Sequence, residues 1–169
     1  MSSVESKQVE HSRAGFFKRL AAMIYDTLVA VAVGMCAALV IIVLLTVLLE
    51  TGILSKQGYD DVSQLIQSSF EYKMVIQIWV SVWIIAFFLW FWKHGGQTIG
   101  MRAWRLRLYS MNENPVGYGR LCIRLATSLL GLGTLLSLVD IKSKLALQDR
   151  ASQIEVLCLS KRANDHKSW

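Results

Sequence analysis

Residues 19–34 read RLAAMIYDTLVAVAVG and open an apolar run that continues to Leu49. Asp26 is the only charged residue between Leu20 and Leu49. A helix of about 20 residues crosses the ~30 Å hydrocarbon layer of a bilayer, so the run predicts a spanning helix over about 20–49. A carboxylate within such a helix costs free energy unless a partner offsets it, and Asp26 therefore needs one.

A second apolar run, Met74–Trp92, contains no charged residue and predicts a second spanning helix over about 74–92. Hydrophobic residues make up 54% of the 169 residues, which is high for a soluble domain. The first run is about twice as long as the core of a signal peptide, so we expect it to remain as an anchor. The expected class is a mostly α-helical integral membrane protein.

Basic residues are distributed unevenly around these helices. The loop 50–73 is mainly acidic, whereas the segments before and after the two helices are basic. The positive-inside rule therefore predicts a multi-pass membrane protein with a cytoplasmic N-terminus and an outer loop at 50–73. Anionic lipids at the inner surface are the expected partners of the basic side chains. Those side chains are Lys7, Arg13, Lys18, Arg19, Lys93, Arg102, Arg105, Arg107 and Arg120.

A third apolar segment, about 120–140, is harder to place. Between Leu125 and Val139 it has only about fifteen uncharged residues, too few for an easy crossing. Gly131 and Gly133 weaken a helix there, and the tail beyond is basic again. We expect a re-entrant segment that bends at these glycines and keeps the C-terminus cytoplasmic, with a full third crossing as the alternative.

Two stretches alternate apolar and polar residues as strands do: RAWRLRLYS at 102–110 and SQIEVLCLS at 152–160. Their pairing would form a small cytoplasmic two-stranded β element and would require both to lie on one side of the membrane. The expected order is a polar tail (1–18), a membrane domain (19–158) and a basic tail (159–169). Within the domain, 93–119 is a cytoplasmic segment, 120–140 the third membrane segment and 141–158 the C-terminal segment.

Motifs for catalysis or cofactors are weak. The stretch HGGQTIGMR at 94–102 lacks the Gly-Lys-Ser/Thr ending of a phosphate loop, so Gly95, Gly96 and Gly100 are interpreted as a helix-end turn. The three cysteines form no CxxC or Cys/His cluster, and no nucleophile–base arrangement is evident. We therefore expect no enzyme activity, no metal or other cofactor and no nucleic-acid partner.

Three stretches carry a family resemblance: GFFKRLAAMIYD (15–26), GGQTIGMRAWRLRL (95–108) and LVDIKSKLALQDRASQIEV (138–156). In this order they resemble the RDD family of bacterial membrane proteins, which is named for one arginine and two aspartates. The matching positions are Arg19, Asp26 and Asp149. Many members carry a histidine where this chain has Gln148, so a proton-handling role for that position is not implied. Proposals for the family centre on transport, including cation/proton exchange in some members, and the resemblance implies a location in the bacterial inner membrane.

Arg19 and Asp26 lie seven residues apart, about 10 Å along a helix and on nearly the same face, too far for direct contact. Each therefore needs a partner from the cytoplasmic segments. We predict a crossed arrangement, in which Arg19 pairs with Asp149 and Asp26 pairs with Arg102 or Arg150. Arg120 and Arg124 are four residues apart and are expected to reach lipid phosphates at the inner surface.

This cluster permits two functions. Asp26 is a protonatable or cation-binding carboxylate in a small transporter, or the cluster is a structural clamp in a non-enzymatic scaffold or accessory subunit. Two spans and a re-entrant segment are too small to enclose a pore alone. The expected partner is therefore a second copy of the chain or another membrane protein.

Overall fold

The computed structural model describes residues 12–56, 58, 61–112, 114–128, 145–161 and 164. The chain forms two compact units. We call them the sheet unit, Met1–Asp26 with Phe91–Trp169, and the helical unit, Thr27–Trp90. The boundaries between the units fall within two long helices, and each unit is described by itself below.

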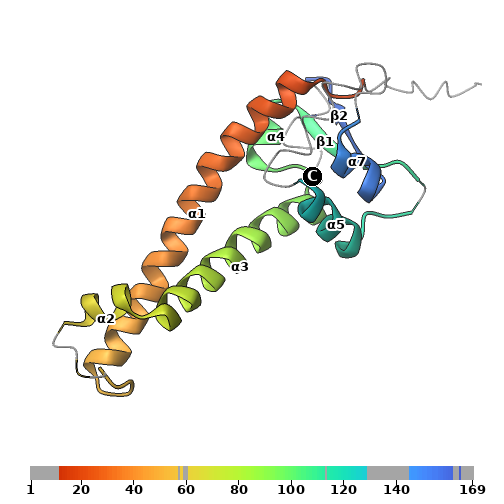
Figure 1. The fold of residues 1–169 in the computed structure, drawn as a ribbon. Helices are drawn as coiled ribbons and strands as arrows, with labels where there is room; N and C mark the ends of the chain where they lie inside the picture. Colours follow the sequence, from red (N-terminus) through yellow and green to blue (C-terminus); the bar gives the residue numbers. More distant parts are fainter. Residues whose placement is uncertain are drawn as a thin grey trace, which may run out of the picture. The chain divides into compact units, whose positions relative to one another are not determined.

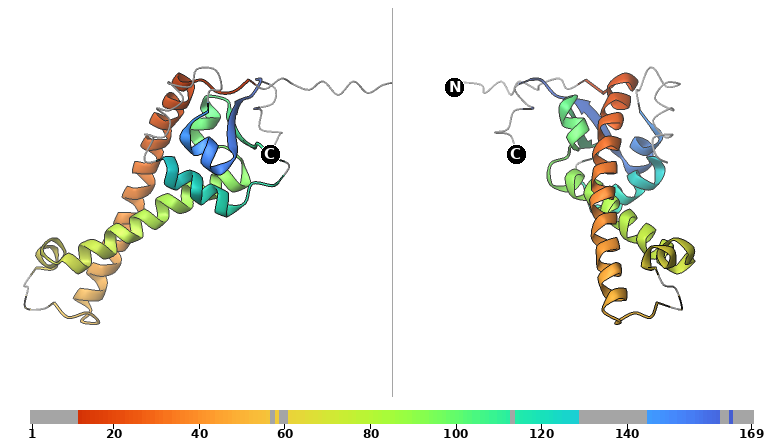
Figure 2. Two further views of the ribbon diagram at one scale, coloured as in Figure 1. Left: turned by 45° about the vertical axis from the view of Figure 1, so that its right-hand side comes forward. Right: turned by 90° about the vertical axis from the view of Figure 1, so that its left-hand side faces the viewer.

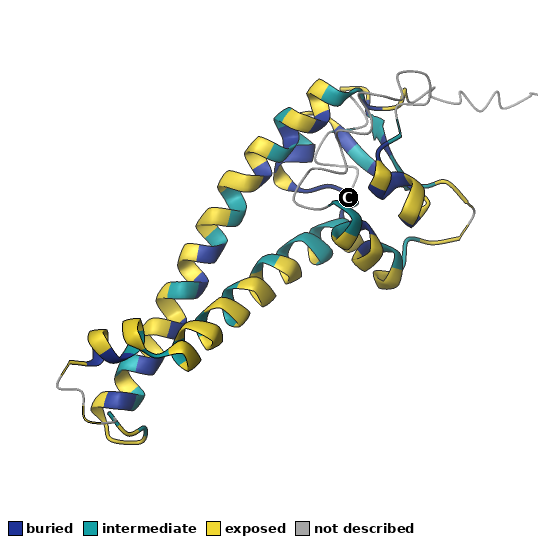
Figure 3. Cartoon of the chain, viewed as in Figure 1, coloured by how far each residue is buried: buried dark blue, intermediate teal, exposed yellow. Residues whose placement is uncertain are grey.

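The two long helices are α1, Phe16–Glu50, and α3, Phe70–His94 (Figure 1). Both are long and apolar enough to cross a membrane, by length and composition. Every residue of α3 is described and none is buried, as the yellow and teal ribbon in Figure 3 shows. Such large exposed apolar surfaces are rare on soluble proteins and fit a lipid environment. The prediction of two long apolar helices is thus confirmed.

Small residues of α1 contact α3 within the helical unit. A Cβ atom added at Gly34 would lie 3.4 Å from Ile84 and 3.5 Å from Val80. The indole Nε1 of Trp79 donates a hydrogen bond of 3.1 Å to the carbonyl oxygen of Ala37. Small side chains let two helices approach closely, which is a common way of packing helices in lipid.

The expected outer loop contains a short helix, α2, Val62–Ser68. Asp61 caps its N-terminus, because the carboxylate accepts hydrogen bonds from the Ser63 amide at 2.9 Å and the Ser63 hydroxyl at 2.8 Å. These bonds lower the pKa of Asp61. Val62 and Leu65 pack with Leu49 at the end of α1 and form a small apolar core.

In the sheet unit, β1 (Leu106–Ser110) and β2 (Ile154–Cys158) pair antiparallel, with Leu106 opposite Cys158 and Ser110 opposite Ile154 (Figures 1 and 2). This confirms the predicted two-stranded element, with shorter strands. Alternate residues are buried, because the apolar side chains of each strand face inward. The buried residues are Leu106, Leu108, Ile154 and Val156.

The segment that precedes α1 also pairs with β2. The Ala14 amide donates to the carbonyl oxygen of Val156 at 2.9 Å, and the Cys158 amide donates to that of Ser12 at 2.8 Å. Arg13 forms an antiparallel bridge with Leu157. The start of α1 is thereby fixed to the strand near the other end of the chain.

Among the described residues, the sheet unit also contains three short helices: α4 (Ile99–Ala103), α5 (Tyr118–Ser128) and α7 (Leu147–Ser152). Helix α5 packs against α7, and α7 leads directly into β2. Helix α5 covers the first part of the expected third membrane segment, 120–140. The rest of that segment, including the bend at Gly131 and Gly133, lies outside the described residues, so the re-entrant form stays a prediction.

A buried arginine–aspartate cluster as the candidate functional site

Asp149 lies in the first turn of α7 and is fully buried, with 0% of its surface exposed. Its Oδ2 atom accepts a hydrogen bond of 3.1 Å from the amide of Ala146, the residue that caps the helix. An acidic side chain at this position satisfies one of the amides that a helix N-terminus leaves unpaired. The local sequence ALQD therefore helps to hold the carboxylate in position through the helix's own N-terminus.

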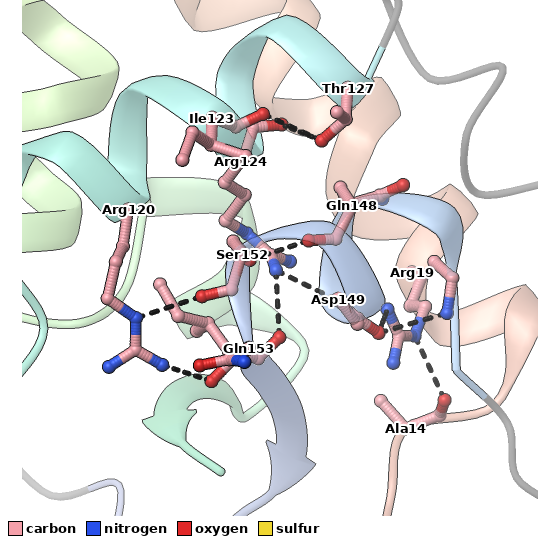
Figure 4. A network of polar contacts seen from close by, with 12 residues as sticks. Ala14, Arg19, Arg120, Ile123, Arg124, Thr127, Gln148, Asp149, Ser152 and Gln153 are labelled. Atoms are coloured by element: carbon pink, nitrogen blue, oxygen red, sulfur yellow. Dashed lines mark hydrogen bonds and ion pairs between the residues drawn. The ribbon is translucent and has the colours of Figure 1, made fainter. Parts of the chain in front are cut away.

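Two arginines from different helices share this carboxylate (Figure 4). Nη1 of Arg19, on α1, lies 2.6 Å from Oδ2, and Nη1 of Arg124, on α5, lies 2.8 Å from Oδ1. Asp149 thus connects α1, α5 and α7. Charge-assisted contacts of this kind are about twice as strong as neutral hydrogen bonds, provided that the groups are held in place.

Both guanidinium groups are held by further contacts. Nε of Arg19 donates to the Ala14 carbonyl at 3.0 Å, and Nη1 of Arg124 donates to the Ile154 carbonyl at 3.1 Å. The Arg124 guanidinium also lies 5.8 Å from the centre of the Trp92 ring. Arg19 is 4% exposed and Arg124 5% exposed. The two arginines therefore depend on protein contacts in place of water.

Asp26 is buried at a separate point of the sheet unit, where α4 approaches α1. The Thr98 hydroxyl donates to Oδ2 at 2.5 Å, and the Gly100 amide donates to Oδ1 at 2.8 Å. The Thr98 oxygen also accepts from the Met101 amide at 3.2 Å and so caps α4. One threonine therefore starts α4 and attaches it to the Asp26 carboxylate.

Gly100 permits this approach. A Cβ atom added there would lie 2.2 Å from the carbonyl oxygen of Ala22 and 2.9 Å from the Asp26 carboxyl. Any larger residue would push α4 away from α1. Gly100 consequently belongs to the contact between α4 and α1, not to the turn that follows α3.

Gly95 and Gly96 form that turn. The Gly95 amide donates to the Phe91 carbonyl at 3.0 Å, which closes the last turn of α3. Gly96 has a φ of +63°, in the left-handed region that glycine adopts without strain. Its carbonyl accepts from the Leu108 amide at 2.8 Å, so the turn is attached to β1.

The structure brings together half of the predicted crossed arrangement. Arg19 and Asp149 lie in contact, as the crossed arrangement requires. The hydrogen bonds to Asp26 differ from the prediction: they come from Thr98 and Gly100 instead of from a guanidinium. Arg102 lies on α4 and its carbonyl accepts from Asn164, while Arg150 is exposed in the last turn of α7. Neutral donors at the start of α4 reach Asp26 because the glycine brings the helix so close.

Arg124 was missed as a member of the cluster. It was expected to extend with Arg120 towards lipid phosphates, but it is buried against Asp149. Arg120 donates to the carbonyl oxygens of Ser152 and Gln153, so it too forms hydrogen bonds within the protein. One signal was available: Arg124 follows Leu121 by three residues, which puts both on the buried face of α5.

Within the part of the chain that the structure describes, no group of three or more His, Cys, Asp or Glu side chains is placed to hold a metal ion. Both Asp149 oxygens are engaged by cations, and both Asp26 oxygens accept hydrogen bonds. The arrangement is suited to fastening helices together.

Comparison with known protein families identifies a match over most of the chain. The profile of the RDD family matches residues 13–153, a range that includes Arg19, Asp26 and Asp149. No curated protein and no solved structure matches the chain.

Proposed function

The chain belongs to the RDD family, and on that basis we propose that it is a non-enzymatic integral protein of the bacterial inner membrane whose buried charges form a structural clamp. Family membership and the two long apolar helices are consistent with a membrane protein. The clamp would fix the sheet unit in one arrangement, as a scaffold or accessory subunit for a second copy or another membrane protein.

One observation carries the proposal: Asp149 is fully buried and receives Arg19 and Arg124 from two other helices. The fold depends on a buried charge with these contacts, because removing one partner leaves another charge uncompensated. The amide of Ala146 engages the same carboxylate. A residue that bound and released an ion in each cycle would have to break these contacts repeatedly.

The pairing of β1 with β2 supports one orientation. Residues 106–110 and 154–158 lie side by side, so both must face the same side of a membrane. With the basic segments inside, the N-terminus, the sheet unit and the C-terminal strand would all be cytoplasmic.

Cysteine labelling tests this orientation. In a chain whose Cys36, Cys122 and Cys158 are replaced with serine, single cysteines are introduced at Gln67, Asn112 and Lys161. We expect a membrane-impermeant maleimide added to intact inverted and right-side-out vesicles to label position 67 only from the periplasmic side. Positions 112 and 161 should react only from the cytoplasmic side. Labelling of position 161 from the periplasmic side would support a full third crossing.

Transport is the second candidate, and one observation favours it. The hydrogen bonds to the Asp26 carboxylate come from an uncharged hydroxyl and an uncharged amide. A buried carboxylate held by neutral groups is a common proton- or cation-binding element of membrane proteins. In that case Asp26 would bind and release the proton or cation, and the contacts of Asp149 would hold the surrounding helices in place.

Flux measurements separate the two candidates. For the clamp, we expect liposomes holding the purified chain to show no more proton or sodium flux than empty liposomes. Asp26→Asn should still destabilise the protein by about 1–3 kcal/mol. The new side-chain NH₂ group is a donor, and it would face the Thr98 hydroxyl or the Gly100 amide, which are donors to the carboxylate in the native protein. Glu71→Gln, which changes an exposed acid of α3, is the matched control. Flux that Asp26→Asn abolishes and Glu71→Gln preserves would contradict the clamp and support transport.

A further inference from the structure

The sheet unit contains an open cavity of about 380 Å³ beside the first turns of α1. Its walls come from three parts of the chain: α1, the α4–β1 turn and the end of β2. The residues that line it include Lys18, Tyr25, Trp104, Arg105, Cys158 and Leu159. Neither the cluster around Asp149 nor the contact at Asp26 uses any of these side chains.

Two cations face this cavity. Lys18 and Arg105 both line it, and among the described residues that line it none is acidic. The Lys18 ammonium group donates to the sulfur of Cys158 at 3.4 Å. An ammonium and a guanidinium beside one cavity are suited to a phosphate group, whose oxygens accept from both.

The backbone holds Arg105 at this position. Its φ is +57°, in the left-handed region that residues with a Cβ seldom adopt. The Arg105 amide donates to the Arg102 carbonyl at 3.1 Å, and the Leu159 amide donates to the Arg105 carbonyl at 2.7 Å. The α4–β1 turn and the end of β2 therefore fix the point from which the guanidinium extends.

The remaining walls are amphipathic or apolar. Tyr25 is 52% exposed and Trp104 is 40% exposed, although both are large aromatic residues. Tyrosine and tryptophan are enriched where a bilayer's headgroups meet its acyl chains. In the sheet unit, the first turns of α1 also expose Phe17, Leu20 and Ile24, which offers an acyl chain an apolar surface. An apolar surface beside the two cations favours a lipid over a small soluble phosphate, which has no acyl chain.

We propose that this cavity binds the phosphate-bearing headgroup of an anionic phospholipid, with Lys18 and Arg105 contacting the phosphate and Tyr25 and Trp104 lying at the headgroup boundary. The inference rests on the proposed membrane location of the chain. It assigns a defined site to one lipid, whereas general attraction to an anionic surface would involve every exposed basic residue equally.

The test measures thermal stabilisation of the full chain in detergent as phosphatidylglycerol is added to the micelles. A ligand that binds only the folded protein stabilises it by RT ln(1 + L/Kd), where L is the ligand concentration, so the rise of the melting temperature with lipid concentration gives an apparent dissociation constant. Phosphatidylcholine is the zwitterionic control, and inorganic phosphate is the soluble source of the same chemistry. We expect stabilisation by phosphatidylglycerol and none by the other two.

Variants assign the effect to the cavity. Lys18→Gln and Arg105→Asn each remove one cation, and asparagine tolerates the backbone conformation at position 105. We expect binding of phosphatidylglycerol to weaken about fivefold for each variant and about 30-fold for the two combined. Lys73→Gln, which removes an exposed cation of the helical unit, should leave binding unchanged.

Three results would overturn the proposal: unchanged binding in the combined variant, an equal loss with Lys73→Gln, or stabilisation by inorganic phosphate as strong as by phosphatidylglycerol. The last would assign the cavity to a soluble phosphate. Extraction of membranes with alkaline carbonate tests membrane integration separately. A protein that resists extraction but fails the lipid test contradicts this inference alone.

Discussion

Replacing Asp149 with asparagine is expected to lower the free energy of unfolding by about 3–5 kcal/mol. The substitution preserves the volume but removes the carboxylate that Arg19 and Arg124 both contact. Two buried guanidinium groups would then face a neutral amide. The free-energy cost of removing each of them from water would no longer be offset by a carboxylate. Unfolding of the purified protein in mixed micelles of increasing dodecyl sulfate content, followed by circular dichroism, measures the loss.

Two comparisons make this expectation specific. Arg19→Gln and Arg124→Gln should each cost less than Asp149→Asn, because the carboxylate keeps one cation in either variant. Glu155→Gln is the matched control, since Glu155 pairs with Arg13 at 2.8 Å on the partly exposed side of the sheet unit. An exposed pair contributes at most about 1 kcal/mol. Equal losses for Asp149→Asn and Glu155→Gln would mean that the cluster is not buried.

Gly100→Ala is the second substitution with a large expected effect. The added methyl group would lie 2.2 Å from the backbone oxygen of Ala22, and backbone atoms cannot move aside as the end of a flexible side chain can. We expect a loss of about 1–3 kcal/mol from overpacking, and more if the displacement breaks the hydrogen bond from the Gly100 amide to Asp26. The same unfolding assay measures it.

Gly119→Ala is the control for that experiment. Gly119 lies in α5, and nothing within 4 Å would meet a Cβ atom there. Because alanine favours a helix over glycine, this change should stabilise the protein by up to about 1 kcal/mol. A Gly100→Ala protein as stable as the Gly119→Ala protein would show that α4 does not approach α1 this closely.

The long helices and the strand pairing could be predicted because their signals extend over many residues. Apolar runs of about 20 residues define a spanning helix by length, and alternation over 102–110 and 152–160 defines two strands. The pairing of Arg19 with Asp149 could be predicted because the resemblance to the RDD family singled out both residues and because Arg19, at the start of an apolar helix, needs an acidic partner.

The partners of Asp26 could not be predicted, because they depend on a five-residue helix. Helix α4 is too short for a periodic pattern, and its contact with α1 depends on a single glycine. A search restricted to opposite charges overlooks a hydroxyl and an amide as partners. Arg124 was missed for a related reason: an arginine on a helix near lipid phosphates is plausible at the surface, and only the docking of α5 on α7 buries it.

The pairing of residues 12–14 with β2 determines when the sheet unit can form during synthesis. Arg13 contacts Glu155 across 142 residues of sequence, and Arg19 likewise reaches Asp149 from near the opposite end of the chain. The ribosome therefore releases the start of α1 long before α7 and β2, which supply these partners, have been synthesised. Contacts so distant in sequence form slowly, because a long loop must close before they are made. The contacts at the start of α1 can therefore form only after α7 and β2 have been translated.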